Sequence, residues 1–79
     1  MTAVETRVRR VLSRVGMVPE EQVTPDAVLT ALDIKSIEQI ECILALEDEF
    51  HVELPPQDLR GLRTVQDVMD AVQRVLATQ

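Results

Sequence analysis

The chain has 79 residues, 46% of them hydrophobic, which allows one domain near the lower size limit for a single core, covering residues 1–79. Its one cysteine excludes an internal disulfide, and no apolar run approaches the ~20 residues that span a bilayer, so we expect a cytoplasmic protein with no membrane partner. The net charge is −6, with nine acidic residues from Asp26 to Asp58, and because such a surface repels phosphates we expect no nucleic-acid partner.

The first predicted element is an amphipathic helix that Gly16 ends. Its apolar residues recur at helical spacing: Val4, Val8, Val11, Leu12 and Val15. Residues 16–35 then form a long connection that contains Pro19 and Pro25. This loop also carries apolar side chains that predict attachment to the core: Val23, Val28, Leu29, Leu32 and Ile34.

A second helix is predicted from Ser36 to Phe50, and its apolar residues fall into two sectors at about 100° per residue. One sector is wide enough to face the core and holds Cys42, Ile43, Leu46 and Phe50. The other holds Ile37, Ile40 and Leu44, with Glu41, Glu47 and Asp48 interleaved. The second sector either contacts the long loop or another helix, or it is a docking surface whose acids select basic partners.

Ser36 also has two interpretations. With Gln39 it fits the S-x-x-Q capping box, which predicts an N-cap. A helix N-terminus also favours an anion, so the serine could carry a phosphoester that another enzyme installs. It is no hydrolytic nucleophile, because the only histidine, His51, lies at the other end of the helix.

No catalytic residue and no metal site are predicted elsewhere in the chain. His51, Glu47 and Glu53 match no specific ligand spacing. Cys42 lies in the core sector without a nearby cation, so we expect a buried and inert thiol.

After the second helix, Pro55-Pro56 breaks the chain and Pro56 suits a short helix through Leu59. Thr64 then resembles the N-cap of a last helix. The apolar stripe of this helix comprises Val65, Val68, Met69, Val72 and Leu76. The predicted fold is all-α, a small four-helix bundle of three main helices and one short helix, with a long loop between the first two.

Two stretches resemble the acyl carrier protein family. S-I-E-Q-I-E-C-I-L-A-L-E-D-E-F is similar to the second helix of that family, and V-E-L-P-P-Q-D-L-R-G-L-R-T-V-Q-D-V-M-D-A-V to the short third helix and the start of the last. The resemblance covers essentially the whole chain and implies a bundle of the acyl-carrier type. It also implies that Ser36 is esterified by 4′-phosphopantetheine, which a phosphopantetheinyl transferase takes from coenzyme A. Such a protein carries acyl thioesters and is no enzyme.

The resemblance further assigns a partner-docking surface to the second helix. The positions that match it are Ile37, Glu38, Ile40, Glu41, Leu44, Glu47 and Asp48. The partners implied are the transferase, a ketosynthase, an acyltransferase or ligase, and tailoring enzymes with basic docking patches. Weak, brief binding to many enzymes suits a protein that is a monomer when free.

One departure from the family concerns the residue before the serine. The usual motif is Asp-Ser-Leu, whereas this chain has Lys35-Ser36-Ile37. Lys35 reverses a charge at the attachment point, so we expect it to change which transferase or partner fits. It also favours specialised polyketide synthesis over fatty-acid synthesis. The alternatives are a peptidyl or aminoacyl carrier, or an unmodified helical protein-binding module in which Ser36 is only a cap.

Overall fold

The computed structural model describes residues 3–59 and 61–78, and this part contains helices and turns without a named strand. The helices are α1 (Ala3–Gly16), α2 (Ser36–Phe50) and α3 (Val65–Ala77), and the 3₁₀ turns are η1 (Glu20–Gln22), η2 (Leu29–Leu32) and η3 (Pro56–Asp58). The predicted all-α fold is therefore confirmed, and the predicted short helix is the single turn η3. None of the helices described is long and apolar enough to cross a membrane.

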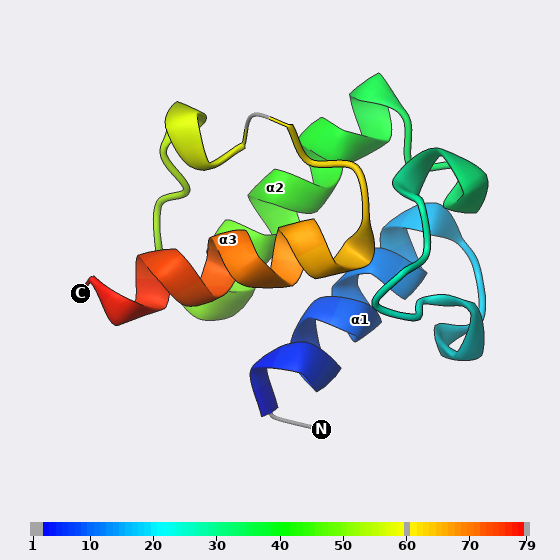
Figure 1. Ribbon diagram of the computed structural model, residues 1–79, viewed down its shortest axis with the longest axis horizontal. Helices are drawn as coiled ribbons and strands as arrows, with labels where there is room; N and C mark the ends of the chain where they lie inside the picture. Colours follow the sequence, from blue (N-terminus) through cyan, green and yellow to red (C-terminus); the bar gives the residue numbers. More distant parts are fainter. Residues whose placement is uncertain (1–2, 60, 79) are drawn as a thin grey trace.

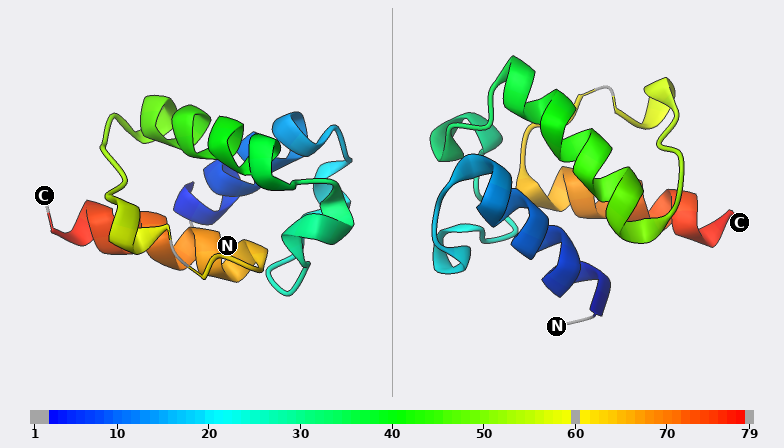
Figure 2. Two further views of the ribbon diagram at one scale, coloured as in Figure 1. Left: turned by 90° about the horizontal axis from the view of Figure 1, so that it is seen from above. Right: turned by 180° about the vertical axis from the view of Figure 1, so that it is seen from behind.

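The three helices surround one apolar core (Figure 1). α1 packs against both α2 and α3. α2 and α3 lie on opposite sides of the core, which the view from above shows most clearly (Figure 2). Arg7 near the start of α1 contacts Glu49 near the end of α2, which shows that the two helices run in opposite directions. The face of α2 that points away from this core is left to solvent.

The predicted apolar stripes of α1 and α3 supply a large part of this core. Their most completely buried members are Val8, Val11 and Leu12 in α1 and Val65, Met69 and Val72 in α3. Burying a Val, Leu or Met side chain stabilises a fold by about 1.5–3 kcal/mol relative to exposure. Helical periodicity alone therefore identified the side of each helix that drives folding.

The long connection between α1 and α2 is attached to the core, as predicted. Val23, Leu29 and Ile34 are at most 2% exposed. Val28 is the exception at 37% exposed, and its backbone forms an isolated antiparallel bridge with Thr64. In this bridge the N–H of Leu29 donates to Arg63 at 2.8 Å and the N–H of Val65 donates to Ala27 at 3.0 Å. The connection is thereby tied to the start of α3.

Gly16 does not end α1 through its own backbone conformation. It is the last helical residue, and Met17 adopts the left-handed conformation with φ 55°. Gly16 is required for close packing instead. A Cβ atom there would lie 2.9 Å from the carbonyl oxygen of Leu32 and 3.2 Å from Cγ1 of Ile34. Only glycine lets the end of the loop approach α1 this closely.

Thr64 caps α3, as predicted. Its hydroxyl accepts the N–H of Asp67 at 3.2 Å, and the Asp67 carboxylate accepts the N–H groups of Thr64 and Arg63, each at 3.0 Å. These backbone donors stabilise the ionised carboxylate and hold the pKa of Asp67 below its usual range. The charge on Asp67 therefore stabilises the folded state.

We predict that Asp67→Asn makes this stabilisation visible as a pH dependence. A carboxylate with a lowered pKa contributes stability above the pKa of the unfolded chain and loses that contribution as the pH falls. In urea unfolding, the variant should be less stable than the wild type above about pH 5, and the difference should shrink below about pH 4. Asp70→Asn, one turn further along α3, is the control, and an equal loss in both variants would contradict the prediction.

Candidate functional site

Ser36 is the first residue of α2 and not its N-cap, so that prediction was wrong. Lys35 occupies the cap position in an extended conformation, and its N–H donates to Oε1 of Glu38 at 3.1 Å. Glu38 therefore does the reciprocal capping that the sequence assigned to Gln39. The Ser36 side chain is exposed, and its hydroxyl makes no hydrogen bond with the residues the structure describes. This hydroxyl is free to be modified.

The surroundings of Ser36 suit a phosphoester. The N–H groups in the first turn of an α-helix have no partner within the helix, and they favour an anion. The Lys35 ammonium lies next to Ser36 in the chain, 4.0 Å from the carboxylate of Asp33, with 68% of the Lys35 side chain exposed. So exposed a pair contributes little to stability. Lys35 can thus turn toward a phosphate without a structural cost.

The two sectors of α2 are separated as the helical wheel indicated. In the core sector Cys42, Leu46 and Phe50 are buried and Ile43 is partly buried. In the other sector the large apolar side chains are exposed: Ile37 by 68%, Ile40 by 59% and Leu44 by 61%. The interpretation that these three contact the loop or another helix is therefore wrong. They form an apolar patch on the outer face of α2.

The acids near this patch differ in what they contact. Glu41 and Asp48 are exposed and make no ion pair or hydrogen bond within the described part of the chain. Glu47 is half-buried and accepts the N–H of Leu54 at 2.8 Å. Glu38 accepts the N–H of Lys35 at the start of the helix. Glu41 and Asp48 are thus the predicted acids that are most available to a partner.

An acid that the sequence did not single out, Glu49, joins α2 to α1. Arg7 donates to its carboxylate and to its carbonyl oxygen, each at 2.7 Å, and the guanidinium lies 4.3 Å from the centre of the Phe50 ring. The hydrogen bond from Arg7 holds the pKa of Glu49 below its usual range. This contact fixes the end of α2 that lies away from Ser36.

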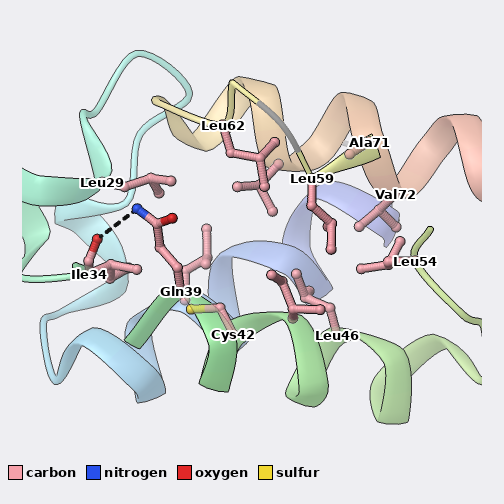
Figure 3. A pocket seen from close by; sticks show the side chains of 13 residues that line it. Leu29, Ile34, Gln39, Cys42, Leu46, Leu54, Leu59, Leu62, Ala71 and Val72 are labelled. Atoms are coloured by element: carbon pink, nitrogen blue, oxygen red, sulfur yellow. Dashed lines mark hydrogen bonds between the residues drawn. The ribbon is translucent and has the colours of Figure 1, made fainter. Parts of the chain in front are cut away.

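A small apolar cavity of about 20 Å³ lies between α2 and α3 (Figure 3). That volume is close to what one water molecule requires. Its lining residues on α2 and α3 are Gln39, Cys42, Ile43, Leu46, Val68, Ala71 and Val72, and Leu59 and Leu62 after η3 also line it.

Gln39, which the sequence analysis assigned only to a capping box, lines this cavity. Its spacing to Cys42, Ile43 and Leu46 is that of a core-facing stripe, and this spacing could have identified its direction.

Cys42 is buried, as predicted. Burial raises the pKa of its thiol to about 12, with a smaller contribution from the nearby Glu41 and Glu38 carboxylates. No group of three His, Cys, Asp or Glu residues in the described ranges could hold a metal ion.

The chain resembles known proteins over most of its length. Residues 6–72 match the family described as the phosphopantetheine attachment site. An acyl carrier protein from Thermobifida fusca is 37% identical over 65 residues, covering 81% of this chain and 82% of that protein. One from Thermosynechococcus vestitus is 36% identical over 72 residues, covering 90% and 89%. The chain belongs to the acyl carrier protein family.

The fold agrees with this assignment. The crystal structure of an acyl carrier protein from Thermotoga maritima superposes with a TM-score of 0.69 at 20% identity, covering 91% of this chain and 93% of that one. Members of the family are carriers and not enzymes, and they carry covalently attached 4′-phosphopantetheine. They interact with phosphopantetheinyl transferases and synthase enzymes.

The raised pKa of Cys42 predicts that its thiol is unreactive in the folded chain. At pH 8 iodoacetamide should label native protein about a thousandfold more slowly than protein in urea, because the thiolate is that much rarer. Since the folded pKa is raised, the free energy of unfolding should also fall as the pH rises above about 8.5.

Mass spectrometry after timed labelling checks the first expectation, and urea unfolding across the alkaline range checks the second. In Cys42→Ala, labelling and the alkaline loss of stability should both disappear. Equal labelling rates for native and unfolded wild type would contradict the prediction.

Proposed function

We propose that Ser36 carries the 4′-phosphopantetheine group and that the chain, a single carrier domain, carries acyl intermediates between the enzymes of a type II polyketide or fatty-acid synthase. The observation that carries this proposal is the exposed hydroxyl of Ser36 on the first turn of α2, without a hydrogen bond to any described residue. When bound, the group supplies a thiol that holds acyl chains as thioesters. The chain itself supplies the attachment oxygen, the docking face and the interior.

The outer face of α2 is the proposed docking surface for partner enzymes. Ile37, Ile40 and Leu44 offer apolar anchors. Glu41 and Asp48 attract a basic patch and accelerate encounter. Three side chains cover much less area than the roughly 1,200–2,000 Å² that stable interfaces bury. Such a surface favours complexes that form and separate quickly, with a carrier that is a monomer between them.

Lys35 is proposed to decide which partners fit. It stands where the acyl carrier motif usually has an acid, and its side chain is 68% exposed beside Ser36. A basic docking groove that accepts Glu41 and Asp48 will be repelled by this ammonium, whereas a groove with an acid at that position will not. This distinction supports a dedicated polyketide pathway over general fatty-acid synthesis.

The cavity between α2 and α3 is the proposed shelter for the first carbons of a cargo. Its volume of about 20 Å³ is too small for an acyl chain, so α2 and the residues after η3 have to separate when cargo enters. The walls are almost entirely aliphatic, and side chains of this kind repack at modest cost.

Modification of Ser36 is tested by intact-protein mass. After incubation with coenzyme A and a promiscuous phosphopantetheinyl transferase, the chain should gain one phosphopantetheinyl group. Ser36→Ala should gain none, whereas Ser13→Ala, the matched control at the other serine, should be modified like the wild type. If the folded wild type and Lys35→Asp both gain no mass while another carrier in the same tube does, the proposal fails, and a binding module becomes the better description.

The docking surface is tested by reversing single charges. With a transferase whose groove is basic, Glu41→Lys and Asp48→Lys should each lower kcat/KM about tenfold at low salt, and Lys35→Asp should raise it, because steering changes in opposite directions. The effects should shrink at high salt.

Glu21→Lys, an exposed position in η1 with the same change in net charge, is the control. A loss in this control equal to that in Glu41→Lys would show that only net charge matters and would contradict a specific docking surface.

A further inference from the structure

Gln39 stands out among the side chains around the cavity. It is the one described lining residue that carries an amide, a hydroxyl or a charge. It lies three residues after Ser36, which places it one helical turn below the attachment oxygen and on the core-facing side. Figure 3 shows it rising from α2 at the end of the cavity where Leu29 and Ile34 lie. Gln39 is therefore the one polar side chain at the end of the cavity where Leu29 and Ile34 lie.

The amide of Gln39 makes one long hydrogen bond within the described part of the chain. Its Nε2 donates to the carbonyl oxygen of Ile34 at 3.4 Å, longer than the usual 2.7–3.2 Å. No described residue donates to its Oε1, and its second N–H has no acceptor among them. Gln39 thus holds a donor and an acceptor ready for a polar group that enters beside Ile34.

We propose that Gln39 recognises oxygenated acyl cargo, an inference that rests on the proposed function of Ser36. A keto or hydroxyl oxygen near the thioester accepts the Nε2–H of Gln39 in place of the long bond to Ile34. The carbons beyond that oxygen lie among the aliphatic walls. A fully reduced chain offers no such acceptor, so entering the interior leaves the amide unsatisfied. The cargo that Gln39 recognises therefore belongs to the β-oxo and β-hydroxy acyl groups.

The test compares two cargoes on the intact chain. Isotope-labelled protein is loaded from the coenzyme A forms of octanoyl and β-oxooctanoyl groups with non-hydrolysable linkages, and its mass confirms loading at Ser36. Methyl shifts of Leu46 and Val72 then report the buried fraction of each cargo, and the side-chain N–H resonances of Gln39 report its hydrogen bond. We expect the Gln39 resonances to move with the oxo cargo and not with the reduced one.

Gln39→Met removes the amide at similar size, and Gln73→Met, at an exposed position of α3, is the matched control. In Gln39→Met the preference of the interior for oxo over reduced cargo should fall about fivefold, which corresponds to the net free energy of one hydrogen bond. Gln73→Met should leave it unchanged.

The outcomes separate the two claims. A chain that gains no mass overturns the proposed function and this inference with it. A chain that is loaded, but in which Gln39→Met changes the burial of both cargoes equally or the Gln39 resonances respond alike, overturns this inference alone.

Discussion

The burial of Ile34 beneath Gly16 is the constraint on which the site depends. The Ile34 side chain is 0% exposed, and the space it fills exists because α1 ends in a residue without a Cβ atom. Its N–H is bonded to Leu29 at 2.9 Å, so η2 and this residue form one rigid support. The chain leaves the core at the next residue, Lys35, and α2 begins directly after it. The chain thus passes from the buried Ile34 to the exposed Ser36 within two residues.

Several carboxylates of α2 also help to hold this helix in place. A helix this acidic would repel itself, but three of its carboxylates have structural donors. Glu38 accepts a backbone N–H at the start of the helix, Glu47 accepts the N–H of Leu54 beyond its end, and Glu49 binds Arg7 of α1. The acids left without donors, Glu41 and Asp48, are exposed on the same helix as the exposed apolar side chains. Glu38, Glu47 and Glu49 therefore help to hold the fold together, and Glu41 and Asp48 remain available for binding.

Sequence patterns predicted the features that depend on local periodicity and missed those that depend on tertiary packing. The core sides of all three helices and the Thr64 cap follow from residue spacing and side-chain chemistry within a few positions. The start of α2 does not follow in this way. Ser36 and Gln39 fit the capping pattern in the sequence, whereas in the structure Lys35 occupies the N-cap position and Glu38 accepts its N–H. The N-cap falls at Lys35 because Ile34, the residue before it, is buried in the core and the helix begins only after this extended segment. Likewise, the role of Gly16 requires Leu32 and Ile34, which are distant in sequence.

The two ends of α2 are held by different kinds of contact. At the far end a bidentate Arg7 contact and the Phe50 ring, the only aromatic side chain, join α2 to α1. At the Ser36 end no ion pair joins α2 to α1 among the described residues, and the support comes from the buried Ile34 and from the long hydrogen bond that Gln39 donates to its carbonyl oxygen. The cavity has its one amide at this end, where the proposed arm is attached.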